Sequence, residues 1–143
     1  MLFCQGGGFK FEIDRDAQVN MSVVCHCDSC RRAHGAPVYH VVWVPQSAFR
    51  IVAGKELKRD FVGKTGLTRS FCSTCGSRLT TESRSMPSFG VGFMPSLLDE
   101  ATQRRFPKQY LPQFHAQHWE APPGLEFVNA PDGVTRFEAP TFL

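Results

Sequence analysis

Residues 25–30 read Cys25-His26-Cys27-Asp28-Ser29-Cys30, and the apolar residues 21–24 before them predict a strand. Residues two apart on a strand point to the same face, so Cys25 and Cys27 would place two sulfurs side by side at its end. A turn through the next two residues then brings Cys30 to the same place. Thiolate sulfur is the soft ligand that zinc often takes in proteins, so this stretch predicts a metal site.

A second cysteine motif lies further along the chain, at Cys72-Ser73-Thr74-Cys75-Gly76. Two cysteines separated by two residues and followed by glycine are typical of a zinc knuckle, because the glycine allows the tight turn beneath the ion. A redox pair of the thioredoxin type needs a strand–helix–strand context. Strand-like segments flank this motif on both sides, which favours the knuckle.

The sixth cysteine, Cys4, stands alone, and spacing leaves two ways to divide the six. One four-thiolate ribbon site would use Cys27, Cys30, Cys72 and Cys75, leaving Cys4 and Cys25 as bystanders. Alternatively, Cys25, Cys27 and Cys30 hold one ion, and Cys4 joins Cys72 and Cys75 at another. Spacing alone does not choose, although the ribbon is weakened because only one of its two knuckles has a glycine.

Length and composition indicate one domain, residues 1–143, in the cytoplasm. The first residues lack the basic start and apolar core of a secretory signal, and no run approaches the ~18 apolar residues that span a bilayer. Six cysteines fall below the ~8–10% typical of disulfide scaffolds, which favours free thiols. The net charge of +3, from 16 basic and 13 acidic residues, forms no basic cluster, so nucleic acid is not an expected partner.

Hydrophobic patterning predicts a mainly β fold with short helices. Apolar residues alternate or cluster as in strands over residues 9–13, 38–44, 49–52 and 89–93. Glycines in the last of these indicate a bulge or a close approach of another backbone. Short helices are expected at 29–34, begun by Asp28 and ended by Gly35, and at 96–101. The proline-rich and aromatic stretch from Phe106 onward predicts an irregular layer.

With these motifs the chain resembles the glutathione-dependent formaldehyde-activating enzymes, whose domain is shared with centromere protein V. The resemblance is carried by two specific central motifs and runs through nearly the whole chain. The matching segments are Cys25 to Arg32 with Gly35-Ala36-Pro37, Arg69 to Ser77, Leu97-Leu98-Asp99-Glu100, Trp119, and in part the opening Cys4-Gln5-Gly6-Gly7.

The resemblance implies a tent-like arrangement of β-sheets and two zinc ions. The family's structural zinc takes an N-terminal Cys-x-Cys pair and the later Cys-x-x-Cys, which here are Cys4, Cys72 and Cys75. Its catalytic zinc takes Cys25, Cys27 and Cys30, with one position open. The implied activity is that of a carbon–sulfur lyase, which joins glutathione or a related thiol to formaldehyde as S-hydroxymethylglutathione.

The chain departs from the family pattern at Gly6, where the second N-terminal cysteine would stand. The structural site then has three sulfurs. Its fourth ligand could be water or a histidine; alternatively the site binds zinc weakly or is empty, or Cys72 and Cys75 oxidise to a disulfide. We expect a three-cysteine site with a non-cysteine fourth ligand. The histidines are His26, His34, His40, His115 and His118.

Other candidate residues have plain structural interpretations. Arg31, Arg32 or Arg69 could bind glutathione carboxylates, although solvated surface positions are the favoured interpretation. His26, between two ligands on a strand, would point away from them into the core or to the surface. Two other functions are compatible with the sequence: a non-enzymatic, zinc-stabilised interaction module, and a redox or metal sensor. An interaction module has no need of a three-ligand site with a vacancy.

Overall fold

The computed structural model describes residues 1–125, 128 and 131–137. The chain divides into two compact units. The first unit comprises Met1–Met21 and Val42–Tyr110, and the second comprises Ser22–Val41 and the described part of Leu111–Leu143. Each is described by itself, and the assignment of residues 1–143 to one domain stays a prediction.

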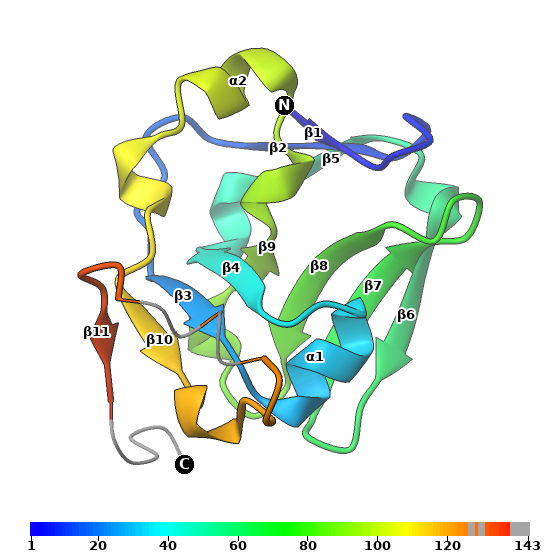
Figure 1. Ribbon diagram of the computed structural model, residues 1–143. Helices are drawn as coiled ribbons and strands as arrows, with labels where there is room; N and C mark the ends of the chain where they lie inside the picture. The colour runs from blue at the N-terminus through cyan, green and yellow to red at the C-terminus, as the bar shows by residue number, and fades with distance from the viewer. Residues whose placement is uncertain (126–127, 129–130, 138–143) are drawn as a thin grey trace. The chain divides into compact units, whose positions relative to one another are not determined.

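The first unit is built on two antiparallel groups of strands (Figure 1). In one group, β2 pairs with both β1 and β5. In the other, β7 pairs with β6 and β8, β8 pairs with β9, and β9 pairs with the last three residues of β4. The strands are β1 (Leu2–Phe3), β2 (Lys10–Ile13), β5 (Phe49–Ala53), β6 (Lys58–Val62), β7 (Leu67–Cys72), β8 (Arg78–Ser83), β9 (Val91–Phe93) and the second half of β4 (Tyr39–Val44), whose first three residues belong to the second unit.

Aromatic side chains from different strands form the core of this unit. Phe11 on β2 and Phe93 on β9 are fully buried, with ring centroids 6.5 Å apart. Burying one such side chain stabilises a fold by about 1.5–3 kcal/mol. Cys4 and Cys72 belong to the same buried cluster and are also fully buried. Of the three cysteines in the first unit, the hydrophobic core therefore encloses Cys4 and Cys72 and leaves Cys75 partly exposed.

Gly90 explains why the glycine-rich segment 89–93 is a strand only from Val91. Its φ is 78°, and a Cβ built on it would lie 2.0 Å from the carbonyl oxygen of Val44. Only glycine permits this approach of two backbones, which confirms the close contact that the sequence predicts. Phe89 instead ends the 3-10 turn η3 (Pro87–Phe89).

In its described residues, the second unit holds the helix α1, the first three residues of β4, and three short strands that pair in parallel. β10 (Phe114–Ala116) lies between β3 (Met21–Cys25) and β11 (Thr135–Arg136), parallel to both. The prediction of an irregular layer after Phe106 is therefore wrong at β10 and β11. Strands of two and three residues are too short to show alternation, and parallel pairing depends on distant residues.

One predicted helix is present with an altered boundary, and the other is divided into two elements. α1 (Asp28–His34) is capped by Cys27 rather than Asp28, and ends at Gly35 in the left-handed conformation. The predicted helix 96–101 is instead a 3-10 turn, η4 (Pro95–Leu97), followed by α2 (Glu100–Arg104). Asp99 separates them because its carboxylate accepts from the backbone N–H of Thr102 and begins a new helix.

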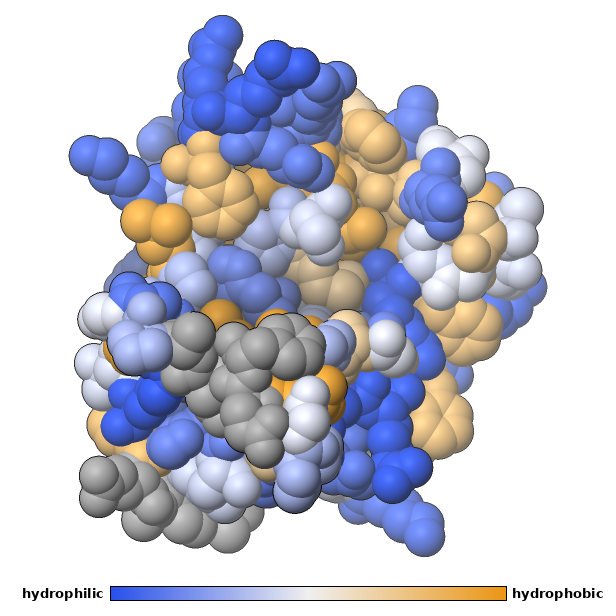
Figure 2. All heavy atoms as spheres, viewed as in Figure 1, coloured by the Kyte–Doolittle hydropathy of each residue, from blue (hydrophilic) through white to orange (hydrophobic). Residues whose placement is uncertain are grey.

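The mainly β fold with short helices is confirmed. Further 3-10 turns are η1 (Gln46–Ala48), η2 (Lys55–Leu57), η5 (Lys108–Tyr110) and η6 (His118–Glu120). Among the described residues, no helix has the length and apolar character needed to cross a membrane. On the face drawn in Figure 2, apolar side chains form separate patches among hydrophilic ones.

Candidate metal centres

The six cysteines gather into two triads, one in each unit. The sulfurs of Cys4, Cys72 and Cys75 lie within 4.8 Å of one another, and those of Cys25, Cys27 and Cys30 do the same. This grouping is the one that the resemblance implies, and it differs from the four-thiolate ribbon that spacing also allows. All six cysteines are free.

The spacing of the sulfurs fits a metal ion. Zinc–sulfur bonds of about 2.3 Å in a tetrahedron place sulfurs roughly 3.8 Å apart, inside the observed limit. No histidine, aspartate or glutamate of the described residues completes either group at that mutual distance. Each triad can therefore hold a metal ion with three protein sulfurs.

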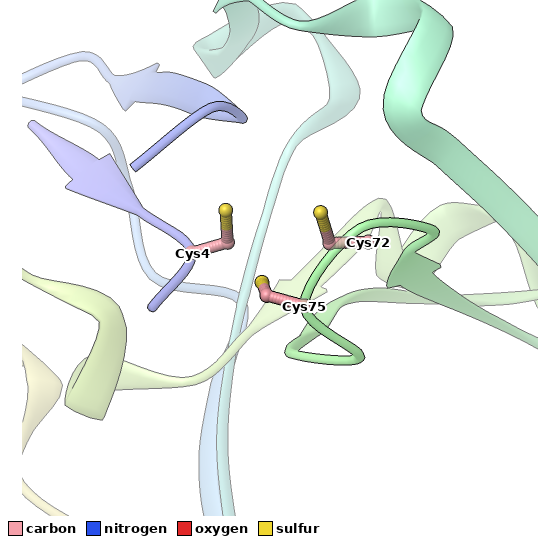
Figure 3. Close-up of side chains that lie close together, drawn as sticks. All are labelled: Cys4, Cys72 and Cys75. Carbon is pink, nitrogen blue, oxygen red and sulfur yellow. The ribbon is translucent and has the colours of Figure 1, made fainter. Parts of the chain in front are cut away.

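The triad of Cys4, Cys72 and Cys75 joins the N-terminal segment to the turn between β7 and β8 (Figure 3). Cys72 ends β7, and the backbone N–H of Gly76 donates to the Cys72 carbonyl at 2.8 Å, closing the predicted knuckle. Gly76 has a φ of 72°, so the conformation favours glycine there. Burial raises the pKa of the Cys4 thiol.

Gly6 lies against Cys75 and occupies the position at which the family pattern has its second N-terminal cysteine. A Cβ built on Gly6 would lie 3.2 Å from the Cβ of Cys75 and 3.5 Å from its sulfur. Ser77, which the sequence analysis did not single out, also contacts Cys75. Its hydroxyl lies 3.3 Å from the Cys75 sulfur and accepts from the backbone N–H of Gln5 at 2.9 Å.

Hydrogen bonds increase the acidity of the Cys75 thiol. The Ser77 hydroxyl, the Ser77 backbone N–H and the Gly6 backbone N–H lower the pKa of Cys75 to about 6. All five histidines belong to the other unit, where residues 22–41 and 111–143 lie. The hydroxyl of Ser77 is a polar side chain of the first unit that contacts the sulfur of Cys75.

The second triad is assembled by the end of β3 and the start of α1. Cys25 is the last residue of β3, and Cys30 lies in the first turn of the helix. The sulfur of Cys27 caps the helix by accepting from the backbone N–H of Cys30 at 3.3 Å. Hydrogen bonding to Cys27 and Cys30, with burial, raises the pKa of the Cys25 thiol.

Arg31 fixes the loop that carries these cysteines. Its guanidinium donates to the backbone carbonyls of His26 and Glu120, and its side chain is 14% exposed. The surface interpretation is therefore wrong for Arg31, and also for Arg69 on β7, which is 4% exposed. It is confirmed for Arg32, whose side chain is 80% exposed and pairs with Asp28.

Of the two predicted positions for His26, core and surface, the structure shows the core. The ring takes part in a hydrogen-bond network of three side chains. Its Nε2 lies 2.7 Å from Nδ1 of His115, whose Nε2 lies 2.9 Å from a carboxylate oxygen of Asp132. The carboxylate only accepts, so His115 donates to it and His26 donates to His115. The Nδ1 of His26 is then left as an acceptor, and it is buried without a hydrogen-bond partner among the described residues.

Burial dominates the acidity of both histidines. It lowers the pKa of His26 to about 4, and it lowers the pKa of His115 despite the opposing hydrogen bond to Asp132. Arg136 donates to the other oxygen of Asp132 and holds the pKa of that carboxyl below its usual range. The two rings are therefore neutral near pH 7.

Gln117 is a further residue that the sequence did not indicate. It follows β10, and its side-chain carbonyl oxygen lies 3.6 Å from the sulfur of Cys25. Its backbone is left-handed, with φ 47° and ψ 39°. No signal in the sequence could find it, because glutamine has no preference for that conformation.

Comparison with known proteins assigns the family. The family described as glutathione-dependent formaldehyde-activating enzyme matches residues 3–118, a span that contains both triads. A comparison with curated proteins finds no match. A crystal structure of a Rhodobacter sphaeroides protein is similar at 23% identity with a TM-score of 0.54, covering 75% of this chain and 94% of that one, which supports the fold. The chain belongs to the glutathione-dependent formaldehyde-activating enzyme family.

Proposed function

We propose that this protein is a zinc-dependent carbon–sulfur lyase that acts on glutathione or a related small thiol and its adduct with formaldehyde. The observation that carries the proposal is the triad of Cys25, Cys27 and Cys30, together with membership of the family. Three sulfurs without a fourth cysteine, histidine or carboxylate among the described residues leave a metal position open, as catalytic sites do. The other triad has the same number of sulfurs, so the catalytic role of Cys25, Cys27 and Cys30 rests on the family resemblance.

The overall reaction makes one carbon–sulfur bond and moves one proton. The thiol sulfur bonds to the formaldehyde carbon, the carbonyl electron pair moves to oxygen, and that oxygen ends with the proton that the thiol loses. A zinc ion bound by the three sulfurs would supply a Lewis-acid position that lowers the pKa of a bound thiol.

The chain's own residues hold this centre in place. Cys27 fixes the start of α1 through its bond to Cys30. Arg31 donates a hydrogen bond to the backbone carbonyl of His26, and the imidazole ring of His26 is hydrogen-bonded to His115. Both the backbone and the side chain of the residue between Cys25 and Cys27 are therefore fixed. This bracing orients the two flanking sulfurs before substrate binds, which is how supporting contacts tune a metal site.

The other triad would hold a structural zinc ion. Cys4, Cys72 and Cys75 connect segments far apart in the sequence, as ligands of structural sites do. We infer that the reduced state of all six thiols is maintained in the cytoplasm. A zinc site in this unit would contribute to folding, because a metal that binds only the folded state stabilises it.

The test combines turnover with metal analysis. Proton NMR would follow formation of S-hydroxymethylglutathione from glutathione and formaldehyde, with Cys27→Ser and Cys72→Ser compared with the wild type. We expect Cys27→Ser to abolish enzyme-dependent turnover, and Cys72→Ser to reduce stability more than intrinsic turnover. Unchanged turnover in Cys27→Ser would remove this triad from the chemistry. A wild type that neither turns over nor changes its cobalt(II) spectrum with thiols would favour the interaction module.

A further inference from the structure

Gln117 has a backbone conformation that its residue type disfavours. Its φ of 47° lies in the left-handed region, where no other non-glycine residue of the described chain is found. Side chains with a Cβ destabilise this conformation, and glycine would adopt it freely. Strained positions of this kind are concentrated at functional sites.

The local turn does not explain why glutamine stands there. Gln117 precedes the 3-10 turn η6 (His118–Glu120), yet its side chain makes no capping hydrogen bond. Asparagine or glycine would suit that position better. The side chain therefore needs another explanation, which its contact with Cys25 supplies.

The position of Gln117 relative to Cys25 is fixed by paired backbones. Ala116 on β10 is the partner of Cys25 on β3 in the parallel register. The backbone N–H of His26 donates to the carbonyl of Ala116 at 2.9 Å, and the His26–His115 bond joins the same two segments. Gln117 therefore directly follows Ala116, whose pairing with Cys25 is held by two hydrogen bonds between the segments. This pairing places the side chain of Gln117 beside the sulfur of Cys25.

A carboxamide has the chemistry to recognise a polar group next to that sulfur. It offers both an acceptor and an N–H donor, and it stays neutral across the accessible pH range. It is a hard, weak ligand for zinc compared with thiolate, so it adds little to metal binding. The side chain is half-buried, which strengthens a hydrogen bond to a ligand relative to one in open water.

We propose that Gln117 is the substrate-orienting residue of the Cys25–Cys27–Cys30 centre. Its carboxamide binds the oxygen on the carbon next to sulfur: the carbonyl oxygen of the aldehyde, or the hydroxyl of the thiol adduct. The N–H donates to that oxygen as it gains the electron pair of the carbonyl, and Gln117 itself transfers no proton. This inference rests on the proposed function and extends it to substrate recognition.

The experiment separates orientation from structure with three variants. Gln117→Gly removes the carboxamide and the strain together, and Gln117→Asn keeps a shorter carboxamide on a residue that tolerates the left-handed region. Gln113→Ala is the matched control, because Gln113 lies just before β10 and its side chain accepts from the backbone N–H of Ser22. Each variant is assayed for thermal unfolding, metal per chain, the cobalt(II) spectrum with glutathione, and turnover of glutathione with formaldehyde.

We expect Gln117→Gly to unfold at the same or a higher temperature and to keep its metal content. Its kcat/KM should fall by about tenfold or more, the value of one hydrogen bond to a charged or developing-charge group. Gln117→Asn should fall between it and the wild type, and Gln113→Ala should retain wild-type turnover.

Three results would overturn the inference. If Gln117→Gly matches an active wild type, the inference fails and the proposed function stands. If Gln117→Gly loses metal or stability in step with turnover, the residue is structural. If the wild type itself neither turns over nor changes its cobalt(II) spectrum with glutathione, the proposed function fails and the inference falls with it.

Discussion

Nε2 of His26 lies 2.7 Å from Nδ1 of His115, a bond between residues 89 positions apart in the chain. Both side chains are buried, at 0% and 3% exposure, so neither ring has water as an alternative partner. The bond therefore links His26, which lies between two cysteines of the triad, to the strand β10 that pairs with β3. Loss of this bond should lower the free energy of unfolding and disturb the positions of Cys25 and Cys27.

His115→Phe tests this bond while keeping a ring of similar size. The substitution leaves Nε2 of His26 buried and unpaired, which should lower the free energy of unfolding by about 1–3 kcal/mol. Urea denaturation of the wild type and the variant measures the difference. Asp132→Asn, which keeps an acceptor for His115, should lose less, and an equal loss in both variants would argue against the His26 bond as the cause.

The two roles of Cys27 can be separated by substitution. Cys27→Ser keeps an oxygen that can cap α1, whereas Cys27→Ala removes both the cap and the ligand. Both variants should lose the metal of that triad. In metal-free protein, Cys27→Ala should be less stable than Cys27→Ser by about 1 kcal/mol. Elemental analysis and denaturation of the apo forms provide the measurements; equal apo stabilities would contradict the capping role.

Gly6→Cys should strengthen metal retention at the triad of Cys4, Cys72 and Cys75. The new Cβ would meet the Cβ of Cys75 at 3.2 Å, so the loop must shift by a few tenths of an ångström. We expect slower zinc loss to a chelator and a higher Tm in the reduced variant. Gly6→Ser is the control for size, and identical zinc retention in the wild type and Gly6→Cys would show that a fourth sulfur adds nothing there.

Asp99 gives the fold of the first unit a defined acid dependence. Hydrogen bonds from the Thr102 hydroxyl and backbone N–H lower the pKa of Asp99 to about 2 from the ordinary 3.8. Because the folded-state pKa is the lower one, this stabilisation is complete above the ordinary value and is lost as the pH falls through about 2. The Tm difference between the wild type and Asp99→Ala should be constant near neutral pH and shrink across that interval.

Thermal unfolding of the two proteins at a series of pH values tests this prediction. Asp99→Asn is the control, because asparagine also caps helices but carries no charge. It should be more stable than Asp99→Ala at every pH. A Tm difference that persists unchanged below pH 2 would show that the charge of Asp99 does not contribute.

The sequence predicts the cysteine motifs well because their geometry is local. Alternation on a strand places Cys25 beside Cys27, and the knuckle glycine Gly76 marks the second site. The pairing of Cys4 with that knuckle follows from the resemblance, since local spacing allows two partitions. The structure then groups the six sulfurs as the resemblance implies.

The residues around the second triad could not be predicted for a physical reason. His115 and Gln117 reach the neighbourhood of Cys25 only because β10 pairs in parallel with β3, a contact across most of the chain. A three-residue strand has too few positions to show a period. The error at α2 has a local cause instead: Asp99 caps a new helix and interrupts the segment predicted to be continuous.

The burial of the first triad makes access to it unequal. Cys4 and Cys72 have no exposed surface, whereas Cys75 is partly exposed beside the side-chain-free Gly6. A chelator or competing metal would therefore approach an ion held by this triad along the flank of Cys75. The rate of metal exchange at this triad would then depend on the segment around Gly6 and Cys75. A bulky residue at position 6 would change the rate of zinc loss as well as the zinc affinity.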